Sequence, residues 1–153
     1  MPKKLSIALY KPDIPQNTAA IIRLCACLDF KLHIIEPCGF NLGDPRLKRI
    51  VMDYIGFSKI FRYEDYEMFL QNNSKSRIIL MTTKAKKSYL KFKFDKNDIL
   101  LFGRESAGVP SSLHKSIKNK LIIPINKKIR SLNVAMSAAI VASEAIRQIK
   151  LLK

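Results

Sequence analysis

Glycine is scarce in this chain, which has five glycines in 153 residues. None of them falls in the segment YKPDIPQNTAA (residues 10–20), which contains the end of the first apolar run and the polar stretch after it. A Rossmann-type dinucleotide site needs a glycine-rich turn there, because the backbone must approach the phosphates closely. The phosphate-loop pattern GxxxxGK[ST] is also absent. A Rossmann-type nucleotide enzyme is therefore disfavoured, and any nucleotide-like cofactor is expected to bind in the C-terminal half.

Long hydrophobic runs are missing as well. No apolar stretch approaches the roughly 18–20 residues of a membrane span, and the run near the N-terminus is shorter than the roughly 7–15 residues of a signal-peptide core. The three cysteines (Cys25, Cys27 and Cys38) cannot all pair within the chain, and no CxxC or Cys/His cluster suggests zinc. We expect a cytoplasmic protein with reduced thiols, without a metal and without a membrane partner.

Acidic residues are few. The chain has 12 Asp and Glu against 28 Lys and Arg, a net charge of +16, and 20 of the 28 basic residues are Lys. An A/T-rich coding sequence could raise the lysine content without selection for binding, but a charge of this size attracts polyanions whatever its origin. Nucleic acid is therefore the leading partner and a membrane surface the weaker one. The 48% of hydrophobic residues are enough for a packed core.

Apolar patterning predicts alternating strands and helices in a single domain, residues 1–153. Short apolar runs predict strands at residues 6–10, 32–36, 78–82, 99–102 and 121–125. Helical spacing and end signals predict helices at residues 17–28, 45–53, 65–71, 110–117 and 132–152, with Asn17 and Asp44 as N-caps. The fold class is therefore α/β, with a mainly parallel sheet and helices on both faces.

Three segments contain most of the candidate functional residues. In PQNTAAIIR (residues 15–23), Arg23 points away from the apolar helix face, either toward a ligand or simply into solvent. LLFGRESAGVP (residues 100–110) places Glu105 just past a buried strand, where open α/β sheets bind ligands, although the pattern also suits a tight strand-to-helix turn. LIIPINKKIRSLNVAMS (residues 121–137) runs through a basic loop to Ser131, a possible helix N-cap, and then to an alanine-rich helix that would let another backbone approach closely.

In this order, PQNTAAIIR, FGRESAGVP and IPINKKIRSLN resemble segments of the SPOUT RNA methyltransferases, most closely the TrmL-like tRNA 2′-O-methyltransferases. RLCACLDFKLHIIEPCGF and DPRLKRIVMDY are also similar, so the resemblance covers nearly the whole chain. It implies a C-terminal trefoil knot, which no general rule of topology would suggest. It also implies bound S-adenosyl-L-methionine and a homodimer with tRNA across the subunit interface. The reaction it implies is methylation of the ribose 2′-hydroxyl of the wobble cytidine or uridine.

The resemblance assigns roles to individual residues. The cofactor is expected to contact Met81, Gly103, Ile123, Ser131 and Leu132. The residues expected to act in catalysis are Arg23, Asn17, Glu105 and Asn133. Because the pKa of arginine exceeds ~12, we interpret Arg23 as a fixed cation that stabilises the developing alkoxide and holds the neighbouring phosphate. The other three would orient Arg23 or the ribose.

The chain departs from the family pattern at Ala19, Ala135-Met136 and Ser143. The first two departures support a second hypothesis, a non-catalytic RNA-binding module that retains the knotted fold and the charge. Under the enzyme hypothesis, the basic residues nearest the site are expected to contact RNA; these are Lys3, Lys4, Arg46, Lys48, Arg49, Lys127, Lys128 and Arg130.

Overall fold

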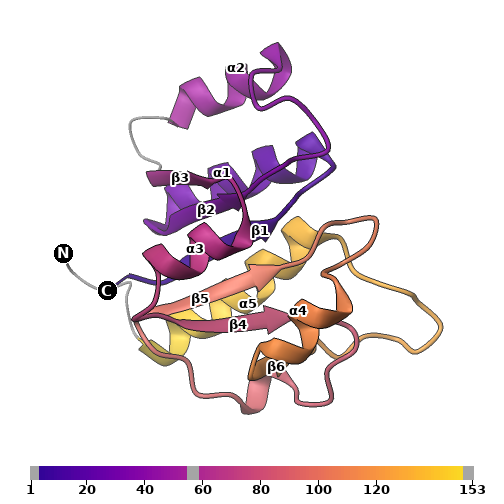
Figure 1. Cartoon of the computed structure of the whole chain (residues 1–153). Helices are drawn as coiled ribbons and strands as arrows, with labels where there is room; N and C mark the ends of the chain where they lie inside the picture. Colours follow the sequence, from indigo (N-terminus) through magenta and orange to yellow (C-terminus); the bar gives the residue numbers. More distant parts are fainter. Residues whose placement is uncertain (1–3, 55–58, 150–153) are drawn as a thin grey trace.

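The computed structural model describes residues 4–54 and 59–149, and its strands form one six-stranded sheet with the order β3-β2-β1-β5-β4-β6 (Figure 1). Every neighbouring pair is parallel. The strands are β1 (Ser6–Tyr10), β2 (Lys31–Ile35), β3 (Lys59–Tyr63), β4 (Arg77–Met81), β5 (Asp98–Phe102) and β6 (Asn119–Leu121). The expected parallel sheet is therefore confirmed.

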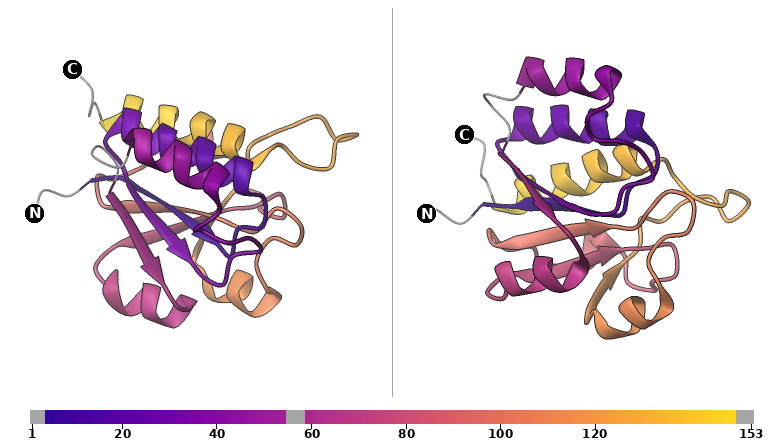
Figure 2. Two further views of the ribbon diagram at one scale, coloured as in Figure 1. Left: turned by 90° about the horizontal axis from the view of Figure 1, so that it is seen from above. Right: turned by 45° about the horizontal axis from the view of Figure 1, so that its top comes forward.

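Helices cover both faces of this sheet. The helices are α1 (Pro15–Leu28), α2 (Pro45–Tyr54), α3 (Tyr66–Asn72), α4 (Ser111–Ser116) and α5 (Val134–Ile149), with a short 3-10 turn, η1 (Tyr89–Lys91). Figure 2 shows α1, α2 and α5 on one face and α3 and α4 on the other. None of these helices, within the described residues, is long and apolar enough to cross a membrane.

The continuous apolar runs of the central strands follow from this double cover. In β1, Ile7 and Leu9 pack into a core cluster with residues of α1 and α5. Ala8 and Tyr10 point the other way and pack with residues of α3 and α4. Successive side chains of a strand point to opposite faces, so a strand covered on both faces needs apolar residues at every position.

The alanines of α5 pack against the protein's own chain. Ala138, Ala142 and Ala145 are fully buried, and α5 contacts both α1 and β5. The close approach of another backbone that the alanines predict therefore takes place within the chain, at α1 and β5. The exposed face of α5 carries larger apolar side chains instead, among them Met136 and Ile140.

Several element boundaries differ from the sequence prediction. α1 begins at Pro15, so Asn17 lies inside the helix and is not its N-cap. β6 ends at Leu121, where the prediction placed its start, because only residues 119–121 pair with β4. β3 and η1 were not predicted. Three of the five residues of β3 are exposed, so this strand has no apolar run that would indicate it in the sequence. The last helix, predicted over residues 132–152, begins at Val134 in the structure. Residues 150–152 of that prediction lie outside the described residues.

Candidate active site

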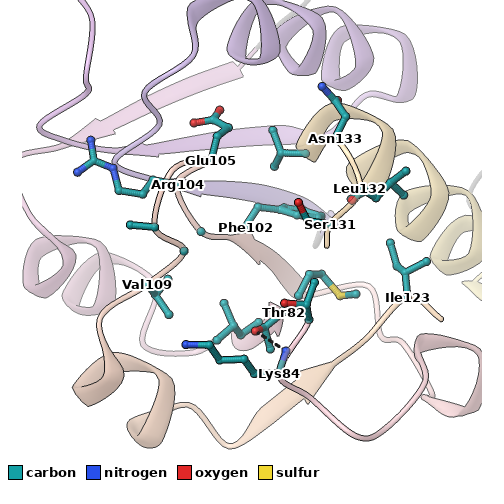
Figure 3. A pocket seen from close by; sticks show the side chains of 18 of the residues that line it. Thr82, Lys84, Phe102, Arg104, Glu105, Val109, Ile123, Ser131, Leu132 and Asn133 are labelled. Carbon is teal, nitrogen blue, oxygen red and sulfur yellow. Dashed lines mark hydrogen bonds between the residues drawn. The ribbon is translucent and has the colours of Figure 1, made fainter. Parts of the chain in front are cut away.

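A cleft of about 520 Å³ opens at the carboxyl edge of the sheet (Figure 3). Its walls are the segments that follow β4, β5 and β6, together with the first turns of α1 and α5. Because all strands are parallel, these segments emerge at the same edge although they are far apart in the sequence. A crevice outside the carboxyl ends of strands is where open α/β sheets bind their ligands.

The cleft brings together eight of the nine residues singled out by the sequence. The eight that line it are Asn17, Met81, Gly103, Glu105, Ile123, Ser131, Leu132 and Asn133. In Figure 3, Glu105 and Arg104 lie on one side of the opening, with Ser131, Leu132 and Ile123 on the other. The ninth residue, Arg23, does not line the cleft.

The loop after β5 is a closed turn that needs glycine at two positions. The backbone of Arg104 is paired twice with that of Gly108, through N–H···O distances of 3.1 and 2.8 Å. Gly108 has a φ of 66°, in the left-handed region that glycine favours. A Cβ at Gly103 would lie 2.6 Å from the Gly108 backbone. Position 103 therefore requires glycine, because the backbone of Gly108 in the same loop lies too close for a side chain.

Glu105 ties this loop to the segment after β1. Its Oε2 accepts a hydrogen bond from the backbone N–H of Asp13 at 2.8 Å, and the Ser106 hydroxyl donates to the Asp13 carboxylate. Burial, followed by the hydrogen bond with Asp13, raises the pKa of Glu105. The pKa of Asp13 is lowered, most of all by its hydrogen bond with Glu105. Two carboxyl groups thus share one site beside the cleft, stabilised by Arg104 3.6 Å from Asp13.

Asn133 connects the first turns of α1 and α5. Its Nδ2 donates to Asn17 Oδ1 at 3.0 Å, and its Oδ1 accepts from the backbone N–H groups of Ala135 and Met136 at 2.9 and 3.1 Å. Asn133 is therefore the N-terminal cap of α5, and the possibility that Ser131 has this role is excluded. Ser131 is exposed and lines the cleft.

Arg23 lies on the exposed side of α1, with its guanidinium 5.6 Å from the ring centroid of Tyr54 in α2. It follows Asn17 by six residues, which is ~9 Å along a helix and well round its circumference. The interpretation that Arg23 points away from the core is confirmed. Within one chain, however, it does not reach the cleft that Asn17 lines.

Lys84, Arg104 and Arg130 also line the cleft, but the sequence pattern gave none of them a role at the cofactor site. Lys84 and Arg104 each come within a few residues of a strand's carboxyl end, and that position was the signal available to find them. Lys4, by contrast, precedes β1 at the opposite edge of the sheet and is paired with Asp29. Lys4 therefore does not lie near the cleft of its own chain, and its contact with RNA stays a prediction; Lys3 lies outside the described residues.

No group of three or more His, Cys, Asp or Glu side chains within residues 4–54 and 59–149 could hold a metal ion. The three cysteines are unpaired, with Cys25 buried, Cys27 exposed and Cys38 between the two. The cleft therefore presents amides, hydroxyls, a carboxyl and basic groups beside apolar side chains, a mixture suited to an organic ligand.

Comparison with known proteins places this arrangement in a family. Residues 4–143 match the SpoU rRNA Methylase family. The tRNA (cytidine(34)-2'-O)-methyltransferase of Beijerinckia indica is 46% identical over 145 residues, which cover 94% of this chain and 91% of that protein. A solved structure from a study of the 2-OH methylation of C/U34 on tRNA has a TM-score of 0.90 and 35% identity, covering 97% of each chain.

A second solved structure shares the fold at lower identity. It is an AdoMet-bound rRNA methyltransferase from Sinorhizobium meliloti, with a TM-score of 0.87 and 22% identity, covering 100% of this chain and 59% of that one. The expected SPOUT fold is confirmed by these similarities, and the C-terminal knot is implied by that fold.

Proposed function

Because the chain belongs to the SpoU rRNA methylase family, we propose that it transfers a methyl group from S-adenosyl-L-methionine to the ribose 2′-hydroxyl of the wobble nucleotide, cytidine or uridine 34, of tRNA. The observation that carries this proposal is the cleft, because it gathers eight expected residues, seven from three separate segments of sequence and Met81 from the end of β4. The names of the relatives supply the nucleic acid and the position.

The cleft fits the cofactor in size and chemistry. Its volume of about 520 Å³ lies within the roughly 300–1,000 Å³ of small-molecule sites. Met81, Ile123 and Leu132 provide apolar surface, and Ser131 provides an exposed hydroxyl. When bound, S-adenosylmethionine supplies a sulfonium methyl group that is open to in-line displacement. These residues would hold and orient it against the ribose.

The hydrogen bonds divide the polar residues by role. Both ends of the Asn133 amide are engaged, so Asn133 positions Asn17 and caps α5. The Asn17 oxygen accepts from Asn133, which leaves its two N–H donors for the ribose or a phosphate. Glu105 holds the segment after β1 through Asp13. Asn17 is therefore the substrate-facing member of the set, and Glu105 and Asn133 are positioning residues.

We propose that Arg23 reaches the cleft of a second copy of the chain in a homodimer. Exposed apolar side chains lie along the mouth of the cleft and the outer face of α5: Leu132 is 37%, Met136 61% and Ile140 38% exposed. Large apolar residues spaced four apart on an exposed helix face are typical of a subunit interface. α1, which carries Arg23, packs beside α5 on the same side of the sheet (Figure 2).

The experiment that tests the function is the incubation of protein, tRNA and methyl-labelled cofactor, followed by mass spectrometry of the nucleosides. We expect 2′-O-methylated cytidine or uridine, located at position 34 by fragment mapping. Cofactor binding without any methylated nucleoside, or no cofactor binding, would favour the RNA-binding module. Ala19, one of the departures behind that alternative, is buried in the core and does not line the cleft.

Mixing two inactive variants tests the dimer. In a random mixture of Arg23→Ala and Asn17→Ala chains, half the dimers are mixed, and each has one site with both residues intact if Arg23 acts from the partner. Activity should then recover to about one quarter of the wild-type value. No recovery in a mixture shown to exchange subunits would place Arg23 in its own chain's site or outside catalysis. A cytoplasmic location and a single domain over residues 1–153 stay predictions, the latter supported by the one sheet that contains all the strands within residues 4–54 and 59–149.

A further inference from the structure

A second hollow lies next to the cleft, along the segment that follows β4. Its volume is about 500 Å³, and Lys84 lines both hollows. Phe92, Leu121, Ala85 and Asn119 form its uncharged surface. Its charged residues are Lys84, Lys86, Lys87, Lys118 and Lys120, and we name it the lysine groove.

The lysine groove has no compensating negative charge. None of its lining residues is acidic, and none of its five lysines forms an ion pair with a described acidic residue. Lys120 donates to the backbone oxygen of His114, at 2.9 Å. His114 itself lines the cleft, and its pKa is lowered by burial and then by the charges of Lys120 and Lys84. A positive field therefore extends from the groove into the cleft.

The groove is built on backbone that is held in place. The backbones of Ile122 and residues 87–89 are paired by two hydrogen bonds of 2.8 and 3.0 Å. Gln148 of α5 donates to the backbone oxygen of Phe92 and accepts from the N–H of Phe94, both at 2.9 Å. Lys87 Nζ lies 5.4 Å from the centre of the Phe92 ring. Fixed attachment points lower the entropy lost when lysines bind a ligand.

We propose that the lysine groove binds the phosphodiester backbone of the RNA whose reacting nucleotide enters the cleft. This inference rests on the proposed function. Five cations without an acid among them suit a chain of phosphates better than one small anion, and the shared Lys84 makes the path continuous with the cleft. Lysine interacts with phosphate as a point charge and lacks the planar fork that reads bases. The groove therefore adds affinity that is independent of sequence.

The test compares two triple variants with the same loss of charge. The groove variant is Lys86→Gln, Lys87→Gln and Lys118→Gln, which leaves Lys84 and Lys120 in place. The control variant changes three exposed lysines at the amino edge of the sheet, Lys59, Lys75 and Lys96, to Gln. For each, tRNA affinity is measured against salt concentration, together with kcat, the KM for tRNA and the affinity for S-adenosylmethionine.

Each phosphate contact contributes about 0.7–0.9 to the slope of log affinity against log salt. At 0.15 M salt, this corresponds to about a fivefold contribution to the affinity from each contact. We expect the groove variant to lose about 2 in slope and to raise the KM for tRNA at least tenfold, with kcat and cofactor affinity unchanged. The control variant should change the slope by less than about 0.7. Equal slopes for the two variants, or a loss of cofactor affinity in the groove variant alone, would overturn the proposal. Because tRNA binding is measured without turnover, a wild-type protein that methylates no tRNA would refute the proposed function and leave this comparison intact.

Discussion

Substitution of Gly103 by alanine should weaken cofactor binding through the shape of its loop. The added Cβ would lie 2.6 Å from both the Cα and the carbonyl carbon of Gly108 and 3.0 Å from the nitrogen of Val109, all backbone atoms. The loop must therefore open by roughly 0.8 Å to restore an ordinary contact. An opening of that size stretches the two hydrogen bonds between Arg104 and Gly108.

The cost of this opening sets the expected effect. Two neutral hydrogen bonds contribute together about 2 kcal/mol. If the closed loop is the form that holds the cofactor, Gly103→Ala should raise the Kd for S-adenosylmethionine at least tenfold, which is about 1.4 kcal/mol. The fold should survive, because the loop lies at the edge of the sheet and outside the two core clusters.

Two other glycines provide graded comparisons in the same assay. A Cβ at Gly108 meets nothing within 4 Å, but the φ of 66° makes alanine unfavourable by about 1 kcal/mol, so a smaller loss of about fivefold is expected. At Gly43, which does not line the cleft, a Cβ meets only the flexible side chain of Asn41, at 3.2 Å, and affinity should stay within about twofold. Calorimetric titration with S-adenosylmethionine and circular dichroism measure binding and folding. A folded Gly103→Ala protein with wild-type affinity would refute the assignment of this loop to the cofactor site.

Three further predictions concern charge and pH. Arg23→Ala should abolish methyl transfer in the nucleoside assay yet keep cofactor affinity, and Arg23→Lys should restore little activity because an ammonium lacks the planar fork; wild-type turnover in either variant would make Arg23 a surface residue only. Neutralising Lys127 and Lys128, which are exposed in the loop before α5, should lower the salt slope of tRNA binding by about 1.5. Neutralising Lys75 and Lys96 at the amino edge of the sheet should leave the slope unchanged. Equal slopes for the two double variants would indicate that RNA binding depends on diffuse charge. The pKa of His33 is lowered to about 4, by burial and then by Lys31, so the unfolded chain binds a proton that the folded chain does not; the free energy of unfolding should fall as pH drops from about 6.5 to about 4, by at most about 1.4 kcal/mol per pH unit. Denaturant titrations of the wild type and His33→Phe should show a shallower pH dependence in the variant, and identical slopes would contradict the assignment.

The patterns that the sequence determined by itself are those with a strong local cause. The apolar runs of β1 and β5 predict strands because their residues must be buried on both faces, and β1 occupies residues 6–10 as expected. Asp44 directly precedes α2 and caps it, with its Oδ1 accepting from the N–H of Arg46 at 2.8 Å. Asp65 caps α3 in the same way. Each of these depends on a side chain and the few residues next to it.

At two places the structure differs from the sequence prediction, because the same local pattern is compatible with more than one structure. The run LIIPI predicts a strand, but only its first residue pairs with β4 as part of β6, while Ile122, Ile123 and Ile125 line the cleft. Apolar side chains that a strand would bury in the core are used here to face a ligand site. Asn17 suits an N-cap, but Pro15 takes the first helical position, and the amide of Asn17 is free to pair with Asn133.

The sequence named eight residues of the cleft, but only the tertiary structure showed that they meet. Asn17 and Asn133 are 116 residues apart, and Asp13 and Glu105 are 92 apart. Asp13 and Glu105 meet because β1 and β5 are parallel neighbours whose carboxyl ends open at one edge, and Asn17 and Asn133 meet because α1 packs beside α5. Arg23 was equally prominent in the sequence, and the same geometry leaves it outside the cleft of its own chain. Composition and spacing select side chains by type, whereas strand order and helix direction decide which of them share a site.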